Sequence, residues 1–332
     1  MASAPDPAVP AVPVVSISVT AYQHAAFLAE CLDSILAQRT SFPYEILLGE
    51  DGSTDGTREI AIRYAEAHPD KIRLFLRDRS QVIMIDGRAT GRGNFLNNFQ
   101  HARGRYLCHL DGDDFWNDPE RLRIMVERME AESDLSMAFH NAWNLFPNGR
   151  QVDYVRQWTG TGPLKVRYSG DDLITQNWIP TGGLIWRIGG ERDVPEVWRT
   201  TIAGDWVVNL FFAQRGPIGC IDKHMSVRRV HGGGLISGMD PVRKMELNLR
   251  MLGIVDRFTH AKHSQPIAKR RVEILSEALR ACVQNGRTAD ARGIWKQLSG
   301  SPSYSATLRE RMRWMVLVRW PRLARWIHRA RS

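Results

Sequence analysis

The sequence has few cysteines, no long apolar run and no secretion signal. Its four cysteines, at positions 31, 108, 220 and 282, form no Cys-x-x-Cys pair, so neither a zinc ribbon nor a disulfide framework is indicated. The longest apolar stretches, such as residues 314–318, are far shorter than the roughly 20 residues that span a bilayer. Residues 1–13 are rich in proline and lack a basic start, so we expect a disordered arm there. These absences predict a cytoplasmic protein without transmembrane helices.

The composition is that of a globular protein with an uneven positive charge. With 332 residues, 43% hydrophobic and 24% charged, the chain can form one large domain or two modest ones. The net charge is +9, and residues 301–332 contribute most of it, with eight arginines against the single acid Glu310. The nearly neutral remainder argues against a broad nucleic-acid groove, so we expect no nucleic-acid partner.

Residues 14–131 alternate between strand-like and helix-like segments. Short runs rich in β-branched and other apolar residues predict strands over 14–20, 44–48, 72–76 and 106–110. Apolar residues at helical spacing predict helices over 24–38, 57–67, 93–103 and 119–131. Repeated βαβ units predict an α/β fold with a mainly parallel sheet and helices on both faces. Ligands bind such sheets at the carboxyl ends of the strands.

The alternation stops after about residue 150. The pattern predicts a strand over 178–187, an amphipathic helix over 205–214 and a short strand over 218–222, and it is helical from residue 244. We therefore expect one α/β domain over residues 14–240, followed by a helical extension over 241–332.

Three carboxylates directly follow the predicted strand 106–110. Asp111, Asp113 and Asp114 occupy three of four successive positions, and such acids repel one another unless a cation is present. Oxygen ligands at a strand end suit Mg²⁺ or Mn²⁺, which would take further ligands from water and a substrate diphosphate. The alternative is an acidic turn before the next helix. The place at the end of a parallel strand favours the metal.

A second polar cluster, residues 49–57, follows the strand 44–48. One of the residues at 53–55 can cap the next helix, which leaves Asp51 able to accept a hydrogen bond from a ligand. At the end of the first strand, the small residues and aromatic ring of Thr20-Ala21-Tyr22 would let a planar base approach the backbone.

Together these segments resemble the family 2 glycosyltransferases, inverting enzymes of the GT-A fold that use nucleotide-diphosphate sugars. Residues 14–22 (VVSISVTAY) look like the family's opening strand, with Gln23 where asparagine is usual. Residues 50–57 (EDGSTDGT) look like its second signature, and Asp111-Gly112-Asp113 matches its DXD motif. Each motif alone is weak, but three in order at successive strand ends are specific, and the resemblance covers about residues 14–240.

The resemblance implies a nucleotide-sugar site and a metal site. Seven residues would contact the nucleotide sugar: Thr20, Ala21, Tyr22, Asp51, Arg92, Asp111 and Gly112. Asp113 would coordinate Mn²⁺ or Mg²⁺, and His231, which precedes a glycine run, would approach the metal or the diphosphate. Two alternatives stay open: Arg92 is a solvated arginine of a glycine-rich loop, and His231 is a loop histidine without a ligand.

The resemblance places the acceptor side further along the chain. Asp205 looks like the acid that supplies the family's general base, although a carboxylate at a helix N-terminus is also favoured by the helix dipole. Trp206, Gly182 and Gly183 would line the acceptor side. The acids at 171 and 172 are the next candidates for the base.

Three further residues near these motifs are interpreted without a role in chemistry. Cys108 and His109 lie inside the strand that precedes the acids, and we expect them to pack there. His24 stands at a helix start, and we expect a capping or surface group.

The implied activity is metal-dependent, inverting transfer of a hexose or related sugar. The donor would be a nucleotide-diphosphate sugar, with a UDP-sugar favoured, and the acceptor a glycan, a lipid-linked molecule or a protein. Bacterial-type surface glycan or glycoconjugate synthesis is the expected setting. Two alternatives stay open: a catalytically silent nucleotide-sugar-binding or scaffold protein, against which the retained carboxylates count, and a nucleic-acid-binding protein that uses the arginine-rich tail.

The basic tail has the pattern of an amphipathic helix. Over residues 320–329, arginines at spacings of three and four lie opposite an apolar stripe, and Pro321 separates this segment from a helix over 308–318. Such a segment can bind an anionic membrane, which would hold the enzyme peripherally at the inner face. The alternative is that its apolar face packs on the catalytic domain.

Overall fold

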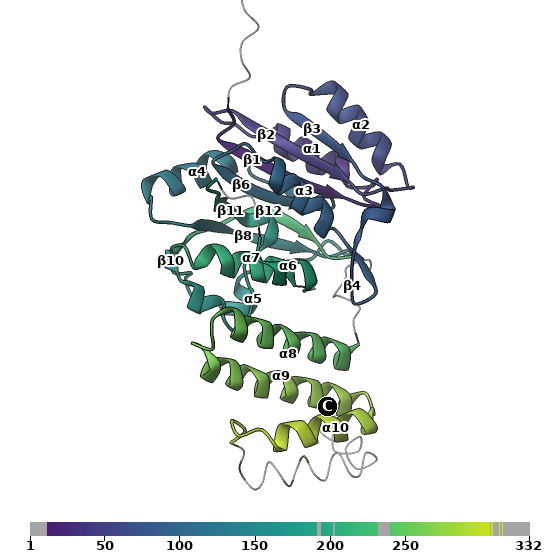
Figure 1. Ribbon diagram of the computed structural model, residues 1–332, viewed down its shortest axis with the longest axis vertical. Helices are drawn as coiled ribbons and strands as arrows, with labels where there is room; N and C mark the ends of the chain where they lie inside the picture. Colours follow the sequence, from purple (N-terminus) through teal and green to yellow (C-terminus); the bar gives the residue numbers. More distant parts are fainter. Residues whose placement is uncertain are drawn as a thin grey trace, which may run out of the picture. The chain divides into compact units, whose positions relative to one another are not determined.

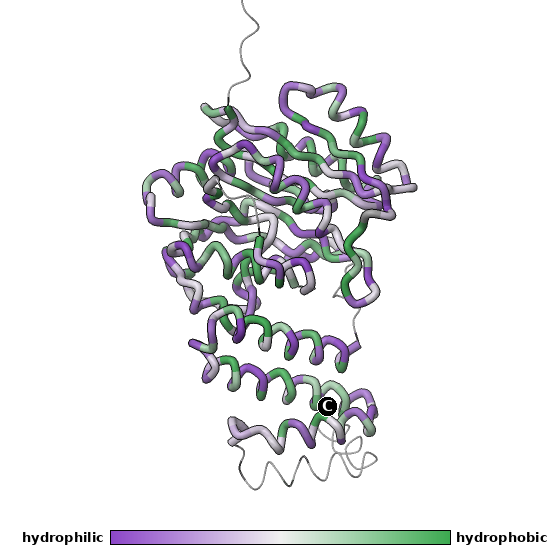
Figure 2. Tube along the Cα trace, in the orientation of Figure 1, coloured by the Kyte–Doolittle hydropathy of each residue, from purple (hydrophilic) through white to green (hydrophobic). Residues whose placement is uncertain are grey.

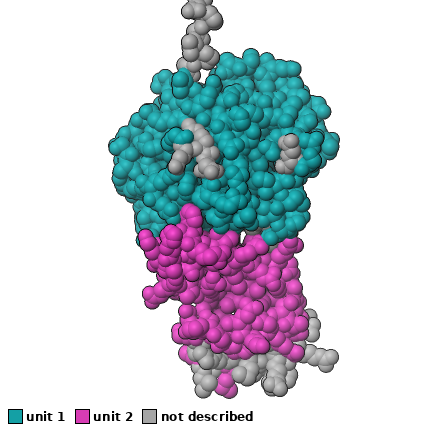
Figure 3. All heavy atoms as spheres, viewed as in Figure 1, with its two compact units in different colours: residues 1–173, 177–230 teal, residues 174–176, 231–332 magenta. Residues whose placement is uncertain are grey.

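The computed structural model describes residues 12–190, 194–201, 203–231 and 240–305, with residues 307, 312 and 314, the side chain of Gln81 excepted. The chain divides into two compact units (Figure 3). The first comprises residues 1–173 and 177–230, and the second residues 174–176 and 231–332. The predicted tail helix over 320–329 lies outside the described residues, as does most of the predicted arm, so both stay predictions.

The first unit is built on a mixed, mostly parallel sheet (Figure 1). Its strands, in the described part of the chain, are β1 (Val15–Ala21), β2 (Tyr44–Glu50), β3 (Ile72–Leu76), β6 (Tyr106–Asp111), β7 (Phe115–Trp116), β8 (Met137–Leu145), β9 (Gln151–Asp153), β10 (Arg167–Tyr168), β11 (Leu184–Arg187) and β12 (Ile218–Arg229). The main order is β10-β12-β8-β11-β6-β1-β2-β3. The strands β6, β1, β2 and β3 run parallel, as predicted, and β11 runs antiparallel between β6 and β8. A separate hairpin pairs β4 (Ile83–Ile85) with β5 (Arg88–Thr90).

Helices cover both faces of this sheet. They are α1 (Leu28–Leu36), α2 (Thr57–Ala67), α3 (Arg92–His101), α4 (Arg121–Ala131), α5 (Arg156–Thr159), α6 (Glu196–Thr200) and α7 (Gly204–Ala213). Short 3₁₀ turns occur at η1 (Arg79–Gln81), η2 (Gly170–Leu173) and η3 (Thr181–Gly183). The helical periodicity of residues 57–67 and 119–131 therefore predicted α2 and α4 to within two residues of their observed starts.

Alternate residues of β1 face the two helical layers, because successive side chains of a strand point to opposite faces. Val15, Ile17 and Val19 belong to a buried apolar cluster that also contains residues of α1, α2 and α4. Ser18 lies on the other face, where its hydroxyl accepts a hydrogen bond from Asn98 of α3 at 3.1 Å. This polar face of the central strand leads directly to Thr20 at its carboxyl end.

The structure corrects three expectations of secondary structure. The strand predicted over 178–187 begins only at Leu184, because Pro180 lacks an N–H and the following Thr181–Gly183 form the η3 turn. The last strand, β12, continues to Arg229 rather than ending at residue 222. A long central strand, β8, was not predicted, since polar residues interrupt its apolar pattern.

The second unit is helical in its described part. It contains α8 (Pro241–Phe258), α9 (Ser264–Gln284) and α10 (Thr288–Ser299). Asp240 caps α8, because its side chain accepts hydrogen bonds from the N–H groups of Val242 and Arg243. All three helices alternate between hydrophobic and hydrophilic colours, as expected for amphipathic helices (Figure 2). Among the described residues, no helix has the length and apolar character needed to cross a membrane.

Candidate active site

The sheet register brings the first and third sequence motifs together. Thr20, near the end of β1, lies opposite Gly49 of β2 on one side and Asp111 of β6 on the other. Its hydroxyl donates a hydrogen bond to Asp111 Oδ1 at 3.1 Å. The carboxyl ends of these strands therefore form one edge, where ligands of parallel sheets bind.

Three carboxylates form a tight cluster at this edge. Asp111, Asp113 and Asp114 each offer an oxygen, and these oxygens lie within 4.8 Å of one another. Burial raises the pKa of Asp114 well above its usual range, and the like charges of Asp113 and Asp111 raise it further. A group of oxygen donors that repel one another fits a hard divalent cation, so Mg²⁺ or Mn²⁺ suits these residues.

Asp111 differs from its neighbours because the chain supports its negative charge. Burial alone would raise its pKa, but the hydrogen bond with His109 and the positive fields of His109 and His24, together with the Thr20 hydrogen bond, lower the pKa to about 2. The carboxylate is therefore ionised and oriented at neutral pH.

Two histidines lie close to this cluster, although the sequence pattern indicated no chemical role for either. His109 Nε2 lies 3.2 Å from Asp111 Oδ1, and His24 Nε2 lies 3.8 Å from Asp113 Oδ2. The space beneath His24 exists because position 112 is glycine, where a Cβ would lie 2.9 Å from His24 Nδ1. The expectation that His24 is a cap or surface group is wrong, since Phe27 is the N-cap of α1 and the His24 side chain is only 19% exposed. The spacing of two between residues 109 and 111 could have placed His109 on the same strand face as the acid.

The second motif, at the end of β2, carries a buried acid that arginines surround. Asp51 Oδ1 lies 3.3 Å from Arg77 Nε, and Oδ2 lies 3.5 Å from Arg79 Nη1. The Arg79 guanidinium lies 3.5 Å from the centroid of the Tyr22 ring. Burial raises the pKa of Asp51, the two arginines oppose this, and the charge of Glu50 adds to it. Arg79 thus contacts both Asp51 and Tyr22, and the sequence pattern did not indicate these arginines.

Hydrogen bonds between two loops hold Tyr22 and His24 in place. The N–H groups of Gln23 and His24 donate to Ser53 Oγ at 3.0 Å and to Thr57 Oγ1 at 2.8 Å. Gln23 adopts a left-handed backbone with φ of 56°, which costs free energy for a residue with a side chain. The second signature therefore positions the segment that follows β1.

Asp205 lies in the first turn of α7 and is exposed. Its Oδ2 accepts a hydrogen bond from Asn177 Nδ2 at 2.9 Å. Burial raises the pKa of Tyr154 to about 12; among charged groups Arg228 lowers it, whereas Asp205 and Asp114 raise it. The charges of Asp205 and Asp114 thus both act on Tyr154, a residue that the sequence pattern did not indicate.

Arg92 points toward the same helix. Its Nη1 donates to the carbonyl of Trp198 at 2.5 Å, and the guanidinium lies 4.7 Å from the Trp198 ring centroid. The side chain also packs against Gly204, where a Cβ would overlap the guanidinium. The structure therefore places Arg92 in the interior beside α7, and its contact with a nucleotide stays a prediction.

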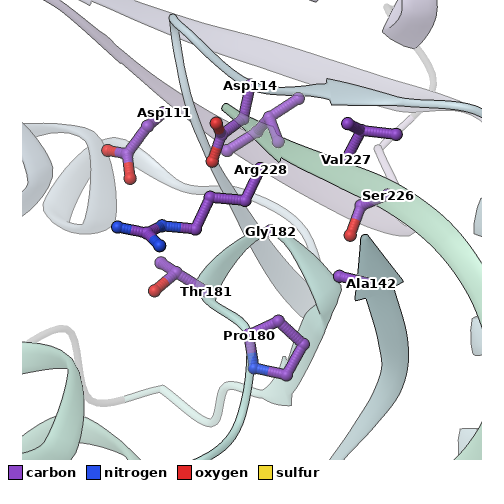
Figure 4. A pocket seen from close by; sticks show the side chains of 10 residues that line it. Asp111, Asp114, Ala142, Pro180, Thr181, Gly182, Ser226, Val227 and Arg228 are labelled. Carbon is purple, nitrogen blue, oxygen red and sulfur yellow. The ribbon is translucent and has the colours of Figure 1, made fainter. Parts of the chain in front are cut away.

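A small pocket adjoins the carboxylate cluster (Figure 4). Its lining residues are Leu110, Asp111, Asp114, Ala142, Pro180, Thr181, Gly182, Ser226, Val227 and Arg228. In Figure 4 the Arg228 guanidinium reaches between Asp111 and Thr181. A hydrogen bond holds the η3 turn in place, because the Gly182 carbonyl accepts from Trp116 Nε1 at 3.0 Å. The predicted acceptor segment thus borders the acids.

The structure does not test the predicted roles of Trp206 and His231. Trp206 is buried, and its indole donates to the carbonyl of Leu173 at 2.7 Å. His231 belongs to the second unit, and the glycine run that follows it lies outside the described residues. The acceptor role of Trp206 and the metal role of His231 stay predictions.

Comparison with known proteins identifies the family. The model of glycosyl transferase family 2 matches residues 16–179. The chain is 29% identical over 222 residues to an uncharacterized protein of Mycobacterium tuberculosis, covering 67% of this chain and 59% of that protein. It is 30% identical over 227 residues to an uncharacterized glycosyltransferase of a Nostoc species, covering 66% of this chain and 65% of that protein. The chain therefore spans less than two thirds of the length of either relative.

Two solved structures share the fold of the first unit and of much of the chain. S. aureus TarS 1–349, determined in complex with UDP, superposes with a TM-score of 0.51 at 16% identity, covering 91% of this chain and 78% of that chain. The mannosyltransferase PcManGT from Pyrobaculum calidifontis, in complex with GDP-Man and Mn²⁺, gives a TM-score of 0.52 at 16% identity, covering 95% and 88%. The fold is thus of the GT-A type. Residues 16–179, which the family model matches, are thus assigned to glycosyl transferase family 2.

Proposed function

We propose that the protein transfers a sugar from a nucleotide-diphosphate sugar to an acceptor hydroxyl, with inversion at the anomeric carbon and a divalent metal ion. The observation that carries this proposal is the cluster of Asp111, Asp113 and Asp114 at the strand ends, whose oxygens lie close enough together to hold a divalent cation. Support also comes from two proteins of the same fold, one in complex with UDP and the other with GDP-Man and Mn²⁺. We favour a UDP-sugar as the donor.

The donor would lie across the ends of β2, β1 and β6. Asp51 and the Tyr22 ring would contact the base, and Thr20, with the adjoining Ala21, would line its path toward Asp111. The carboxylates of Asp111 and Asp113 would hold the metal ion. When bound, the ion would neutralise negative charge on the departing diphosphate. Arg228, which reaches into the pocket beside Asp111, would add a positive charge at the same place.

Asp205 would act as the general base. It would accept the proton of the acceptor hydroxyl while that oxygen bonds to the anomeric carbon and the bond to the diphosphate breaks. The η3 turn, with Gly182 and Gly183, would border the acceptor. We propose a glycan, a lipid-linked molecule or a protein as acceptor, in the synthesis of a bacterial-type surface glycan. Membrane attachment through the basic tail belongs to this proposal.

The test is a screen of UDP-, GDP- and TDP-sugars with Mn²⁺ or with EDTA, using the full chain and the Asp205→Asn variant. We expect one donor class to be turned over only with metal, and the variant to bind donor normally while its rate falls roughly 100-fold or more. Asp171→Asn is the matched variant, because Asp171 is the alternative base. Donor binding without turnover by the wild type would instead indicate a silent binding protein.

Liposome flotation tests the membrane part separately. We expect the full chain to float with anionic vesicles, and a chain that ends near residue 301 to stay in the soluble fraction. Equal recovery of both chains in the soluble fraction would contradict attachment through the tail.

A further inference from the structure

A row of side-chain hydrogen bonds leads from the interior to Asp205. The indole Nε1 of Trp186 donates to Asn209 Oδ1 at 3.3 Å. Asn209 Nδ2 donates to Asn177 Oδ1 at 3.2 Å, and Asn177 Nδ2 donates to Asp205 Oδ2 at 2.9 Å. The four residues come from β11, from α7 and from the segment before η3, so the row joins parts of the first unit that are distant in sequence.

Every hydrogen bond of the row runs from donor to acceptor in the same sense, and Trp186 determines that sense. An indole N–H can only donate, so the Asn209 amide must turn its oxygen toward Trp186 and its NH₂ group toward Asn177. The Asn177 amide is then turned in the same way, with its NH₂ group toward Asp205. An ionised carboxylate can accept hydrogen bonds but cannot donate one, so it is a suitable last member of such a row. The orientation of each amide therefore follows from its neighbour.

Burial shows that this row is costly to build. Asn209 is fully buried on a helix whose neighbouring buried residues are apolar, and Trp186 is 2% exposed. Asn177 is half-buried and Asp205 is exposed. A buried amide lowers stability unless it is hydrogen-bonded, and an apolar residue would pack at position 209 without that requirement. The row thus runs from the core to an acid at the surface.

A buried cation lies beside the same acid. The Arg92 guanidinium packs against Gly204, the residue before Asp205. Burial lowers the pKa of Arg92 to about 10, and the field of Asp205 opposes this, which shows that the two charges interact. Arg92 is thus a buried positive charge next to the residue at which the row ends.

We propose that Trp186, Asn209 and Asn177 form a positioning relay that holds Asp205 Oδ2, so that Oδ1 is the oxygen that takes the acceptor proton. This inference rests on the proposed function, because it assigns the relay a role only if Asp205 is the base. In the step, the acceptor O–H bond breaks and its proton goes to Oδ1. The acceptor oxygen bonds to the anomeric carbon, the bond between that carbon and the diphosphate oxygen breaks, and the electron pair of this bond leaves with the diphosphate. The three relay residues touch neither donor nor acceptor.

A double-mutant cycle on the full chain tests the relay. We expect Asn177→Ala to lower kcat roughly tenfold to 100-fold, with the KM for the donor changed less than about twofold, because a misplaced base slows only the chemical step. Asn177→Asp keeps the shape of the side chain but cannot donate a hydrogen bond when ionised, so its kcat should be no higher than that of Asn177→Ala. In an Asp205→Asn background, Asn177→Ala should have no further effect. Asn148→Ala, in an exposed turn, is the matched control.

Each remaining outcome decides the matter. An Asn177→Ala enzyme at the wild-type rate, beside a slow Asp205→Asn enzyme, would overturn the relay and leave the base in place. An equal loss in both backgrounds would show a merely structural role and overturn the relay. An Asp205→Asn enzyme at the wild-type rate would overturn the base, and the relay with it. Trp186→Phe, which keeps the ring and removes only the donor, should lower kcat a few-fold, and unchanged kcat would contradict the direction of the row.

Discussion

Two acidic regions at the same edge of the sheet differ in what balances their charge. At the end of β2, Glu50 Oε2 lies 2.5 Å from Arg58 Nε, and Asp51 pairs with Arg77 and Arg79. At the end of β6, the hydrogen-bond partners of Asp111 are Thr20 and His109, and that of Asp114 is the main-chain N–H of Arg229. We term these the paired region and the cation region. In the paired region guanidinium nitrogens lie within 3.5 Å of the carboxylate oxygens, whereas in the cation region oxygens of three carboxylates lie within 4.8 Å of one another.

The difference separates acids that have guanidinium partners from acids that lie close to one another. A buried acid with a guanidinium partner stabilises the fold, and its removal leaves the partner unbalanced. An acid among like charges destabilises the fold until a cation arrives. The two regions should therefore respond in opposite directions when an acid is neutralised.

The largest effect is expected in the cation region. Asp113→Asn should lower metal-dependent sugar transfer roughly 100-fold or more, because a metal ion contributes several kcal/mol to stabilising the departing diphosphate. Turnover with Mn²⁺ and with EDTA measures this effect. Asp70→Asn, in an exposed turn, should behave as the wild type. Turnover by Asp113→Asn that equals the wild type in both conditions would remove the cation region from the mechanism.

Neutralising an acid of the paired region should lower stability instead. Glu50→Gln keeps the shape but leaves Arg58 without its charge partner, so the free energy of unfolding should fall by roughly 2 kcal/mol. The Arg58 side chain is 34% exposed, which keeps the loss below that of a fully buried pair. Urea unfolding measures it, with Glu66→Gln on the surface of α2 as the control. A loss of unfolding free energy no larger than that of the control would show that the ion pair between Arg58 and Glu50 does not stabilise the fold.

Asp51 tests whether the paired region also binds nucleotide. Asp51→Asn should weaken nucleotide binding about tenfold, or roughly 1.4 kcal/mol, since one carboxylate contact to the base is lost. Calorimetric titration with UDP measures the affinity, and Mn²⁺ binding should stay unchanged. Unaltered UDP affinity would assign Asp51 to structure alone.

In the cation region, Asp114→Asn should raise stability when no metal is present. The variant removes a like charge whose ionisation the fold already disfavours, so the gain should be up to about 1 kcal/mol in thermal or urea unfolding. Asparagine can still accept the hydrogen bond from the Arg229 N–H. A variant less stable than the metal-free wild type would contradict the picture of mutual repulsion.

The smallest effect concerns Glu45, an arginine-paired acid at the other end of β2. Burial would raise its pKa, but hydrogen bonds from Ser16, Arg103 and Arg73 lower it below the ordinary value of 4.5. The ionised form therefore stabilises the fold above pH 4.5, and this stabilisation is lost as the pH falls through the lowered pKa. The difference in unfolding free energy between wild type and Glu45→Gln should shrink from pH 7 to pH 3. A constant difference would show that ionisation of Glu45 contributes nothing.

Sequence patterns predicted those strands in which apolar or β-branched residues follow one another along the chain. The β-branched residues of 14–20 predicted β1, and the apolar residues 46–48 predicted β2, because short runs of these types are typical of buried strands. The strand β8 escaped this reasoning, since it carries His140, Asn141 and Asn144. Their polar groups are satisfied by distant partners, as when Asn141 donates to Asp153 at 2.9 Å, and no local pattern encodes such pairs.

The candidate site was predictable only where its residues stand in short motifs. Asp111 and Asp113 were found because adjacent acids at a strand end are conspicuous, and the register then placed Thr20 beside them. Tyr154 and Asn177 belong to irregular segments without a motif. Their relation to the acids depends on how distant segments pack, which single-sequence periodicity does not contain.

The alternation along β1 has a consequence for how variants of this protein can be selected. Its odd positions fill the apolar core, while Ser18 and Thr20 lead to Asp111 on the other face. A slip of one residue would turn the hydroxyls into the core and the aliphatic side chains toward the ligand edge. A slip in strand register that misplaces the site residues would thus also lower the free energy of unfolding. A simple screen for protease resistance should therefore discard mis-registered sheets, leaving library members whose strand ends are already aligned for substrate.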